Sequence, residues 1–246
     1  MHSYERFSYV YDRLMEDAPY DEWAKLVIKE TSTGSILDLG SGTGECSLRL
    51  ADAGFDVTAV DLSEHMLSVA QNKAIQNKLS LKFLQQDMRE LETGELYDVI
   101  TIFCDSLNYV TDREGVQSVL KSVYTHLKPD GVLLFDVHSL YKMTELFIGH
   151  TFASNEDDVS YIWNSFAGDE VGEVEHELSF FVQNEEDLYE RFDEVHFQRT
   201  FQIAEYMAWL SEAGFEDCSV SADFTELAPT DKAERLFFRA VKPQKG

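Results

Sequence analysis

The sequence predicts an α/β domain, in which helices cover both faces of a largely parallel β-sheet, together with an inserted antiparallel sheet. Two observations point to this class. Up to about residue 140, short apolar runs alternate with stretches of helical periodicity, as in consecutive strand–helix–strand units. Between residues 151 and 200, apolar and polar residues alternate instead, which is typical of strands with one buried face.

Five runs rich in Val, Ile, Leu and Phe are expected to form the strands of the first region. Several of them lack a two-residue alternation, as strands buried on both faces of a parallel sheet do. The runs are Ser35–Leu39, Asp56–Val60, Leu81–Gln85, Asp98–Phe103 and Val132–Val137.

Helices are expected between these strands, over Glu45–Ala53, Glu64–Asn77 and Asp112–Leu127. The third of them places its Val and Leu residues on one stripe at helical spacing. The segment Lys128-Pro129-Asp130-Gly131 then ends that helix and turns the chain into the next strand.

Residues 151–199 differ from the rest in charge and in pattern. The segment 151–200 carries fourteen Asp or Glu and two Arg, which leaves a net charge of −12. Turn-forming residues at 168–169 and 184–187 divide the region into three antiparallel strands. We expect this sheet to be inserted into a domain formed by residues 1–150 and 200–246, and to serve as a substrate lid.

Beyond the insert, the chain returns to the α/β pattern. An amphipathic helix is expected over Gln202–Ala213, where Gly214 ends it. Strands are expected near Phe215–Phe224 and over Arg235–Val241. These elements complete the sheet that the first region begins.

The composition limits the classes of partner. The 246 residues include 46 Asp and Glu against 20 Lys and Arg, a net charge of −26. Such a charge disfavours nucleic acid or an anionic membrane as the main partner and mildly favours a cationic substrate. The three cysteines lie far apart, which argues against a disulfide framework, and no apolar run reaches the ~18 residues of a membrane span. We therefore expect a cytoplasmic protein.

A glycine-rich loop carries the strongest local signal. In Asp38-Leu39-Gly40-Ser41-Gly42-Thr43-Gly44, three alternate glycines follow a strand and precede a helix. Glycine permits unusual backbone angles and the close approach of a ligand. The helix N-terminus that follows presents free N–H groups toward whatever lies on the loop.

Acidic residues end the next two strands. Asp61 is in reach of a ribose, whose hydroxyl groups a carboxylate can hold, and Asp87 is placed to accept from an adenine amino group. Taken alone, each acidic residue is typical of an ordinary helix cap or of the end of a strand. A nicotinamide dinucleotide fits less well, because position six of the glycine pattern is Glu45 and Asp38 would repel a pyrophosphate. Asp38 suits a positively charged ligand.

The glycine loop, Asp61 and Asp87 together resemble the class I S-adenosylmethionine-dependent methyltransferases. The likeness covers residues 34–140 well and 201–242 more loosely. Three further segments are similar to the YqeM-like bacterial subgroup, which also carries an inserted β-sheet: Tyr9–Asp12, Phe103–Tyr109 and Phe135–Ser139. The resemblance implies a Rossmann-like, seven-stranded, mostly parallel sheet of order 3-2-1-4-5-7-6, with S-adenosyl-L-methionine as the cofactor at the carboxyl ends of strands 1 to 4.

The resemblance also implies which residues bind the cofactor. The methionine part would lie against the glycine loop and the residue after the fourth strand, and the adenosine part against the acids and their neighbours. An N-terminal tyrosine, foremost Tyr11 and less so Tyr4 or Tyr9, would close over the site. The implied set is Tyr11, Asp38, Gly40, Ser41, Gly42, Asp61, Leu62, Met66, Asp87, Met88 and Cys104.

Methyl transfer from a sulfonium is an in-line displacement, for which an amine or hydroxyl acceptor also needs a proton acceptor. Candidates follow the fourth and fifth strands or lie in the insert: His138, Tyr141, Asn108 and His196. His138 fits a helix cap equally well, and a lone His on a strand is usually structural. No set of residues has metal-ligand spacing.

Three functions stay open at this point. The first is a methyltransferase for a small-molecule acceptor, acting as a monomer or homodimer. The second is a methyltransferase of tRNA, ribosomal RNA or a ribosomal protein, for which the sequence offers only the scattered Lys73, Lys78, Lys82 and Lys121. The third is a regulator that binds S-adenosylmethionine without turnover.

Overall fold

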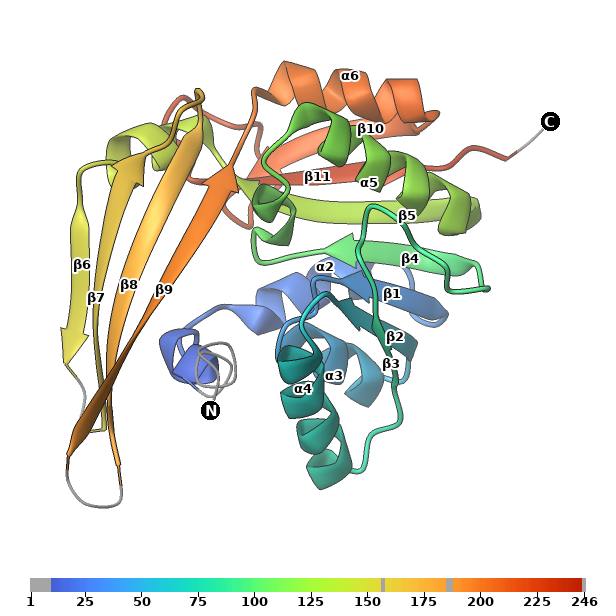
Figure 1. The fold of residues 1–246 in the computed structure, drawn as a ribbon. Coiled ribbons are helices and arrows are strands. Elements are labelled where there is room, and N and C mark those ends of the chain that lie inside the picture. Colours follow the sequence, from blue (N-terminus) through green and yellow to red (C-terminus); the bar gives the residue numbers. More distant parts are fainter. Residues whose placement is uncertain (1–9, 156–157, 185–187, 245–246) are drawn as a thin grey trace.

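The computed structural model describes residues 10–155, 158–184 and 188–244, and it contains two separate β-sheets (Figure 1). The larger sheet has seven strands in the order β10-β11-β5-β4-β1-β2-β3. The smaller is antiparallel, with four strands in the order β6-β7-β8-β9. Since β11 and β10 take the places of strands 7 and 6, the predicted Rossmann-like order is confirmed.

The first five strands of the larger sheet are parallel to one another, and β11 runs antiparallel between β5 and β10. The bounds are β1 (Ser35–Leu39), β2 (Asp56–Asp61), β3 (Lys82–Gln85), β4 (Tyr97–Ile102), β5 (Leu127–His138), β10 (Glu216–Ala222) and β11 (Arg235–Val241).

Helices cover both faces of this sheet. On one face, α5 and α6 pack on the main core, and on the other, α2 and α3 pack on a second cluster that includes Trp23 and Leu50. The helices are α2 (Tyr20–Glu30), α3 (Glu45–Asp52), α4 (Glu64–Asn77), α5 (Arg113–His126) and α6 (Ile203–Ala213), with short η1 (Ser106–Tyr109) and η2 (Lys142–Phe147).

Local chemistry explains where these helices begin. Ser63 caps α4 by accepting from the Met66 N–H, and Asp112 caps α5 by accepting from the Gly115 N–H at 2.6 Å. Gln202 and Glu205 form a reciprocal capping box at α6. The predicted starts of these three helices agree with the structure to within one residue.

Three elements differ from the sequence analysis. α2 was not predicted at all. β5 begins directly after α5, at Leu127, so the expected turn at 128–131 lies inside the strand as an irregular segment with Asp130 at φ 62°. The inserted sheet has four strands instead of three, because the short, polar segment β6 (Thr151–Asn155) adds to one edge.

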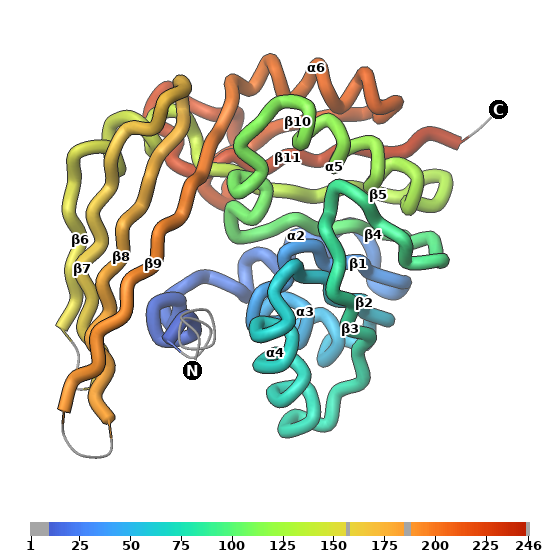
Figure 2. Tube along the Cα trace, viewed as in Figure 1, coloured from blue at the N-terminus to red at the C-terminus, as the bar shows by residue number. Residues whose placement is uncertain are grey.

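The inserted sheet, hereafter the lid sheet, continues with β7 (Val159–Ala167), β8 (Glu173–Gln183) and β9 (Tyr189–Arg199). It stands beside the carboxyl ends of the parallel strands, and the chain around residues 10–19 runs between it and the larger sheet (Figures 1 and 2). Val10 there packs against Phe180 and Phe192 of the lid sheet. The turn predicted at 168–169 connects β7 to β8, while residues 185–187 of the second turn lie outside the described part.

Candidate active site

A hollow of about 320 Å³, counted with the solvent at its mouth, opens at the carboxyl ends of β1 and β4. Residues that follow both strands line it, together with residues of α2, α3 and the N-terminal segment. The lining residues are Tyr11, Tyr20, Asp38, Gly40, Ser41, Gly42, Thr43, Glu45, Cys46, Phe103 and Cys104. Six of the eleven residues predicted to bind the cofactor are therefore brought together here.

The glycines of the loop serve different purposes. A Cβ on Gly40 would lie 2.6 Å from the Ser106 Cβ, and a Cβ on Gly44 would lie 2.8 Å from the Ala70 Cβ. These two glycines let the loop and α3 pack closely on their neighbours. At Gly42, a Cβ would meet nothing closer than Tyr11 at 3.9 Å, so this position alone leaves open space for a ligand. All three have positive φ, which favours glycine.

Asp61 ends β2 beside the loop. Its two carboxylate oxygens accept from the backbone N–H groups of Gly42 and Ser63, each at 2.8 Å. Burial raises the pKa of Asp61, and these backbone donors oppose that rise. A carboxylate has about four acceptor positions, so both oxygens retain capacity for the hydroxyl groups of a ribose.

Asp38 lies beneath the hollow and is 2% exposed. It accepts from Ser47 Oγ at 2.5 Å and from Thr101 Oγ1 at 2.8 Å. Burial raises the pKa of Asp38 to about 6, against which the two hydroxyl donors work. A buried carboxylate with only neutral partners favours a cation nearby, and the ammonium group of S-adenosylmethionine fits that requirement.

The predicted adenosine residues lie outside the hollow. The guanidinium of Arg89 donates hydrogen bonds to both carboxylate oxygens of Asp87, with its Nε 3.0 Å from each. This contact holds the pKa of Asp87 below its usual range. Leu62 is 67% exposed, as expected of an apolar residue that a ligand covers. Met88 packs on the main core, whereas Met66 packs toward the lid sheet.

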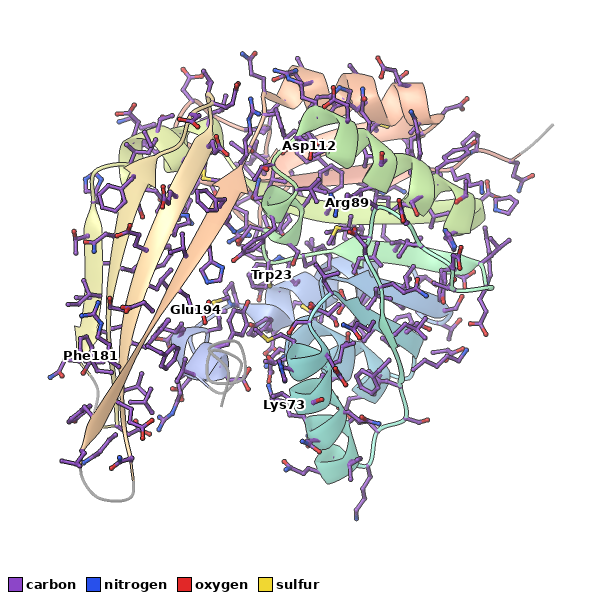
Figure 3. The ribbon with its side chains drawn as sticks, viewed as in Figure 1. Trp23, Lys73, Arg89, Asp112, Phe181 and Glu194 are labelled. Carbon is purple, nitrogen blue, oxygen red and sulfur yellow. The ribbon has the colours of Figure 1, made fainter. Side chains whose placement is uncertain are left out.

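The loop after β4 has an unusual backbone. Cys104 and Asp105 both adopt left-handed conformations, at φ 54° and 52°, which non-glycine residues rarely do. Their N–H groups donate to the two oxygens of Asp136, at 2.9 and 3.1 Å. Asp136 is fully buried and also accepts from Trp23 Nε1 at 2.8 Å and from Arg235. Figure 3 labels Trp23, which lies on α2.

Asp105 is the centre of a second group of contacts. Its carboxylate accepts from Arg235 at 2.8 Å and from Gln198 Nε2 at 2.9 Å, and His138 Nε2 lies 3.4 Å away. Burial opposes ionisation, but the contacts with His138, Arg235 and Gln198 outweigh it and hold the pKa of Asp105 well below its usual range. Sequence reasoning assigned no role to Trp23, Gln198 or Arg235, and it noted Asp136 only as part of the segment Phe135–Ser139.

None of the four predicted catalytic residues is among those lining the hollow. His138 is 5% exposed, and burial lowers its pKa to about 4, so the imidazole is neutral at pH 7. His196 is half-buried on β9, with its ring edge-on to Tyr109. Tyr141 is half-buried and immediately precedes η2.

Asn108 has a structural role that the sequence did not reveal. It is fully buried, its Nδ2 donates to the Arg199 carbonyl at 2.8 Å, and its Oδ1 accepts from the His138 N–H at 2.9 Å. Both ends of the amide therefore hold backbone, and a catalytic role for Asn108 stays a prediction. Tyr4 and Tyr9, the alternative N-terminal tyrosines, lie outside the described residues.

Comparison with known proteins identifies the family of the chain. A family model described as a methyltransferase domain matches residues 36–131. The chain is 51% identical to the methyltransferase YqeM of Bacillus subtilis, with 97% of each chain covered, and 48% identical to a Geobacillus methyltransferase, covering 98% of this chain and 100% of the relative. A crystal structure of an S-adenosylmethionine-dependent methyltransferase from Clostridium acetobutylicum has a TM-score of 0.88 at 30% identity, covering 98% of this chain and 100% of that one.

The chain belongs to the YqeM-like S-adenosylmethionine-dependent methyltransferases. The resemblance noted in the sequence and the expected cofactor are thereby confirmed. Within the described residues, no helix is long and apolar enough to span a membrane, and no group of three His, Cys, Asp or Glu side chains is arranged to hold a metal ion.

Proposed function

We propose that this methyltransferase acts on a small molecule held between the carboxyl edge of the seven-stranded sheet and the lid sheet. The observation that carries the proposal is the division of the lid's inner face. Its outer end is apolar, where Leu178, Phe180 and Phe192 pack on the N-terminal segment. Toward the seven-stranded sheet the same face becomes more polar: His176 pairs with His196, and β9 places Glu194 opposite Leu178 and Gln198 opposite Val174.

Figure 3 supports this reading of the lid. Glu194 lies on the side of β9 that faces the N-terminal segment, and Phe181 lies on the opposite side of the sheet. Glu194 is 7% exposed, so this carboxylate is withdrawn from bulk solvent. An enclosed face with acidic and neutral imidazole groups suits a compact, polar acceptor, and its charge favours a cationic one.

The surroundings of the hollow do not suit a polyanion. Lys73 is a basic residue on α4 that lies beside the start of α3. Its ammonium group forms ion pairs with Asp12 at 2.6 Å and with Glu45 at 2.7 Å. On the lid side, Arg199 pairs with Glu170 at 3.1 Å. Because acidic partners neutralise these cations, they do not form the basic track that RNA binding requires.

The chain's own residues would align the acceptor and exclude water. Bound S-adenosylmethionine supplies a methyl carbon activated by a sulfonium. Asp38 and Asp61 would orient the cofactor, and Tyr11 would shield the hollow on the side of the N-terminal segment. His138 stays our candidate proton acceptor, because its Nε2 is directed at Asp105 and its buried Nδ1 has no hydrogen-bond partner within the described part of the chain.

The test is incubation with S-adenosylmethionine labelled in the methyl group and a size-fractionated bacterial extract. We expect label in a low-molecular-weight product, and none with an Asp61→Asn variant. Label found only in RNA or protein would reject the small-molecule acceptor. Tight cofactor binding without a labelled product from any fraction would favour a regulator.

A further inference from the structure

We infer that Gln198 is a positioning residue, through which the lid sheet holds the loop at Cys104 and Asp105 in the shape that receives the methionine part of the cofactor. The inference rests on the proposed role of this sheet as a lid. It extends that role, because a lid coupled in this way acts on cofactor binding as well as on the acceptor.

The loop needs support from outside. Cys104 and Asp105 are two consecutive non-glycine residues in left-handed conformations, which persist only where the surroundings hold them. Asp136 holds the backbone through the Cys104 and Asp105 N–H groups. The Asp105 side chain extends from the loop, and its partners fix the other end.

The partners of Asp105 come from distant segments. Arg235 is on β11 and Gln198 is near the end of β9, which belongs to the lid sheet. Gln198 is 4% exposed, so water cannot readily replace it. Its Nε2 donates to Asp105 Oδ2 at 2.9 Å. A buried hydrogen bond to a carboxylate is among the stronger neutral-to-charged contacts that a protein makes.

The orientation of the Gln198 amide follows from its partner, because an ionised carboxylate can only accept and the amide nitrogen must therefore face Asp105. Trp163 Nε1, which can only donate, is 2.9 Å from His176 Nδ1, so the proton of the neutral His176 must be on Nε2. His176 Nε2 is buried and has no hydrogen-bond partner within the described part of the chain. The contact that joins the lid sheet to Asp105 is therefore the Gln198 hydrogen bond itself.

This contact gives the coupling its consequence. Moving the lid sheet away would take one donor from Asp105 and leave the loop held by Asp136, Arg235 and His138. Cys104 lines the hollow, so a change in the loop reaches the cofactor. By reciprocity, a cofactor that fits the loop must also favour the closed position of the lid sheet.

The experiment compares two ligands by calorimetry: S-adenosylmethionine, and 5′-methylthioadenosine, which lacks the amino-acid part. For Gln198→Leu we expect about a tenfold loss of S-adenosylmethionine affinity, the size of one hydrogen bond to a charged group, and little change for 5′-methylthioadenosine. Gln198→Glu places a second carboxylate against that of Asp105, and this variant should lose at least as much S-adenosylmethionine affinity. The matched control is Gln117→Leu, since Gln117 also bonds a carboxylate, Glu212, but far from the site.

A second readout follows the lid sheet directly. Adding S-adenosylhomocysteine should slow amide hydrogen exchange in β7 and β9 of the unmodified protein, and should do so much less in Gln198→Leu. If Gln198→Leu does not fold, Gln198→Asn shortens the same contact by one methylene and is read in the same way.

The outcomes separate this inference from the proposed function. Unchanged S-adenosylmethionine affinity in Gln198→Leu would overturn the inference. Equal losses for both ligands would also overturn it, because the effect would then be general and not confined to the methionine end. Neither result affects the labelling experiment that searches for a small-molecule product. That experiment alone decides the proposed class of acceptor.

Discussion

Two pairs of acidic residues, a short distance apart in the fold, are treated in opposite ways. Asp38 and Asp61, beneath and beside the hollow, accept only from hydroxyl and backbone N–H groups. Asp105 and Asp136, at the junction with the lid sheet, share the guanidinium of Arg235. Among the described residues Asp38 and Asp61 thus have no cationic partner, and a ligand can supply one. Asp105 and Asp136 already have the guanidinium of Arg235. The difference distinguishes the carboxylates that we propose bind the ligand from the carboxylates that hold the fold together.

The strongest test of this contrast is Arg235→Leu. Removing the cation leaves two buried carboxylates unpaired, and we expect the free energy of unfolding to fall by about 3–5 kcal/mol. Arg235 holds the pKa of Asp105 below its usual range, and this stabilisation is present at neutral pH and lost as pH falls. The gap between variant and unmodified protein should therefore shrink toward acidic pH in chemical denaturation.

The matched control is Arg239→Leu on the same strand, where Arg239 pairs with Glu30 and Asp217 near the surface. It should cost about 1 kcal/mol or less. Equal losses in the two variants would contradict the special role of Arg235.

The next test addresses the binding pair through Asp61→Asn. An amide cannot replace both charge-assisted hydrogen bonds to a ribose, each worth about 1.5–3 kcal/mol. We expect at least a tenfold weaker affinity for S-adenosylmethionine by calorimetry, with a similar loss for 5′-methylthioadenosine. Asp56→Asn, at the exposed start of the same strand, is the control and should bind normally. Unchanged affinity in Asp61→Asn would refute the ribose assignment.

A pH titration sharpens the contrast further. Since the pKa of Asp38 is raised to about 6, this carboxylate is charged above that pH and protonated below it. A cationic ligand prefers the charged form, so affinity should be level above pH 6 and fall by up to tenfold per unit below it. Asp38→Asn should remove this slope. A profile with the same slope in both proteins would show that another group titrates.

The smallest effect is expected on the outer face of the lid sheet. Val195 is 50% exposed and faces away from the junction, so Val195→Thr keeps the branched shape and removes little buried area. The free energy of unfolding should change by no more than about 0.5 kcal/mol, with cofactor affinity unaltered. A clear loss of binding would mean that the outer face also acts on the site.

Sequence reasoning succeeded where contacts are local. β1, α4 and β11 have the predicted bounds, and the Gly42–Asp61 contact joins residues only 19 positions apart. The junction is different, because Arg235 reaches Asp105 across 130 positions and no motif spans such a distance. The sequence of β6 is polar and resembles that of a loop. β6 is a strand because it pairs with β7, and its own sequence does not indicate that pairing.

α2 could have been found. It follows Pro19, has Asp21 and Glu22 in its first turn, and buries Tyr20, Trp23 and Val27 at helical spacing. Overlooking it also hid Trp23, which donates to Asp136 beneath the loop. When a helix is overlooked in the sequence, the site residues that it carries are overlooked as well.

β11 is the last strand of the chain, yet it lies inside the sheet between β10 and β5. During translation, segments emerge from the ribosome in order and begin to fold from the N-terminal side. Asp105 and Asp136 are thus made long before Arg235, the cation that lets them be buried. The loop at Cys104 and Asp105 therefore cannot gain its full set of contacts until β11 has been made and has inserted into the sheet.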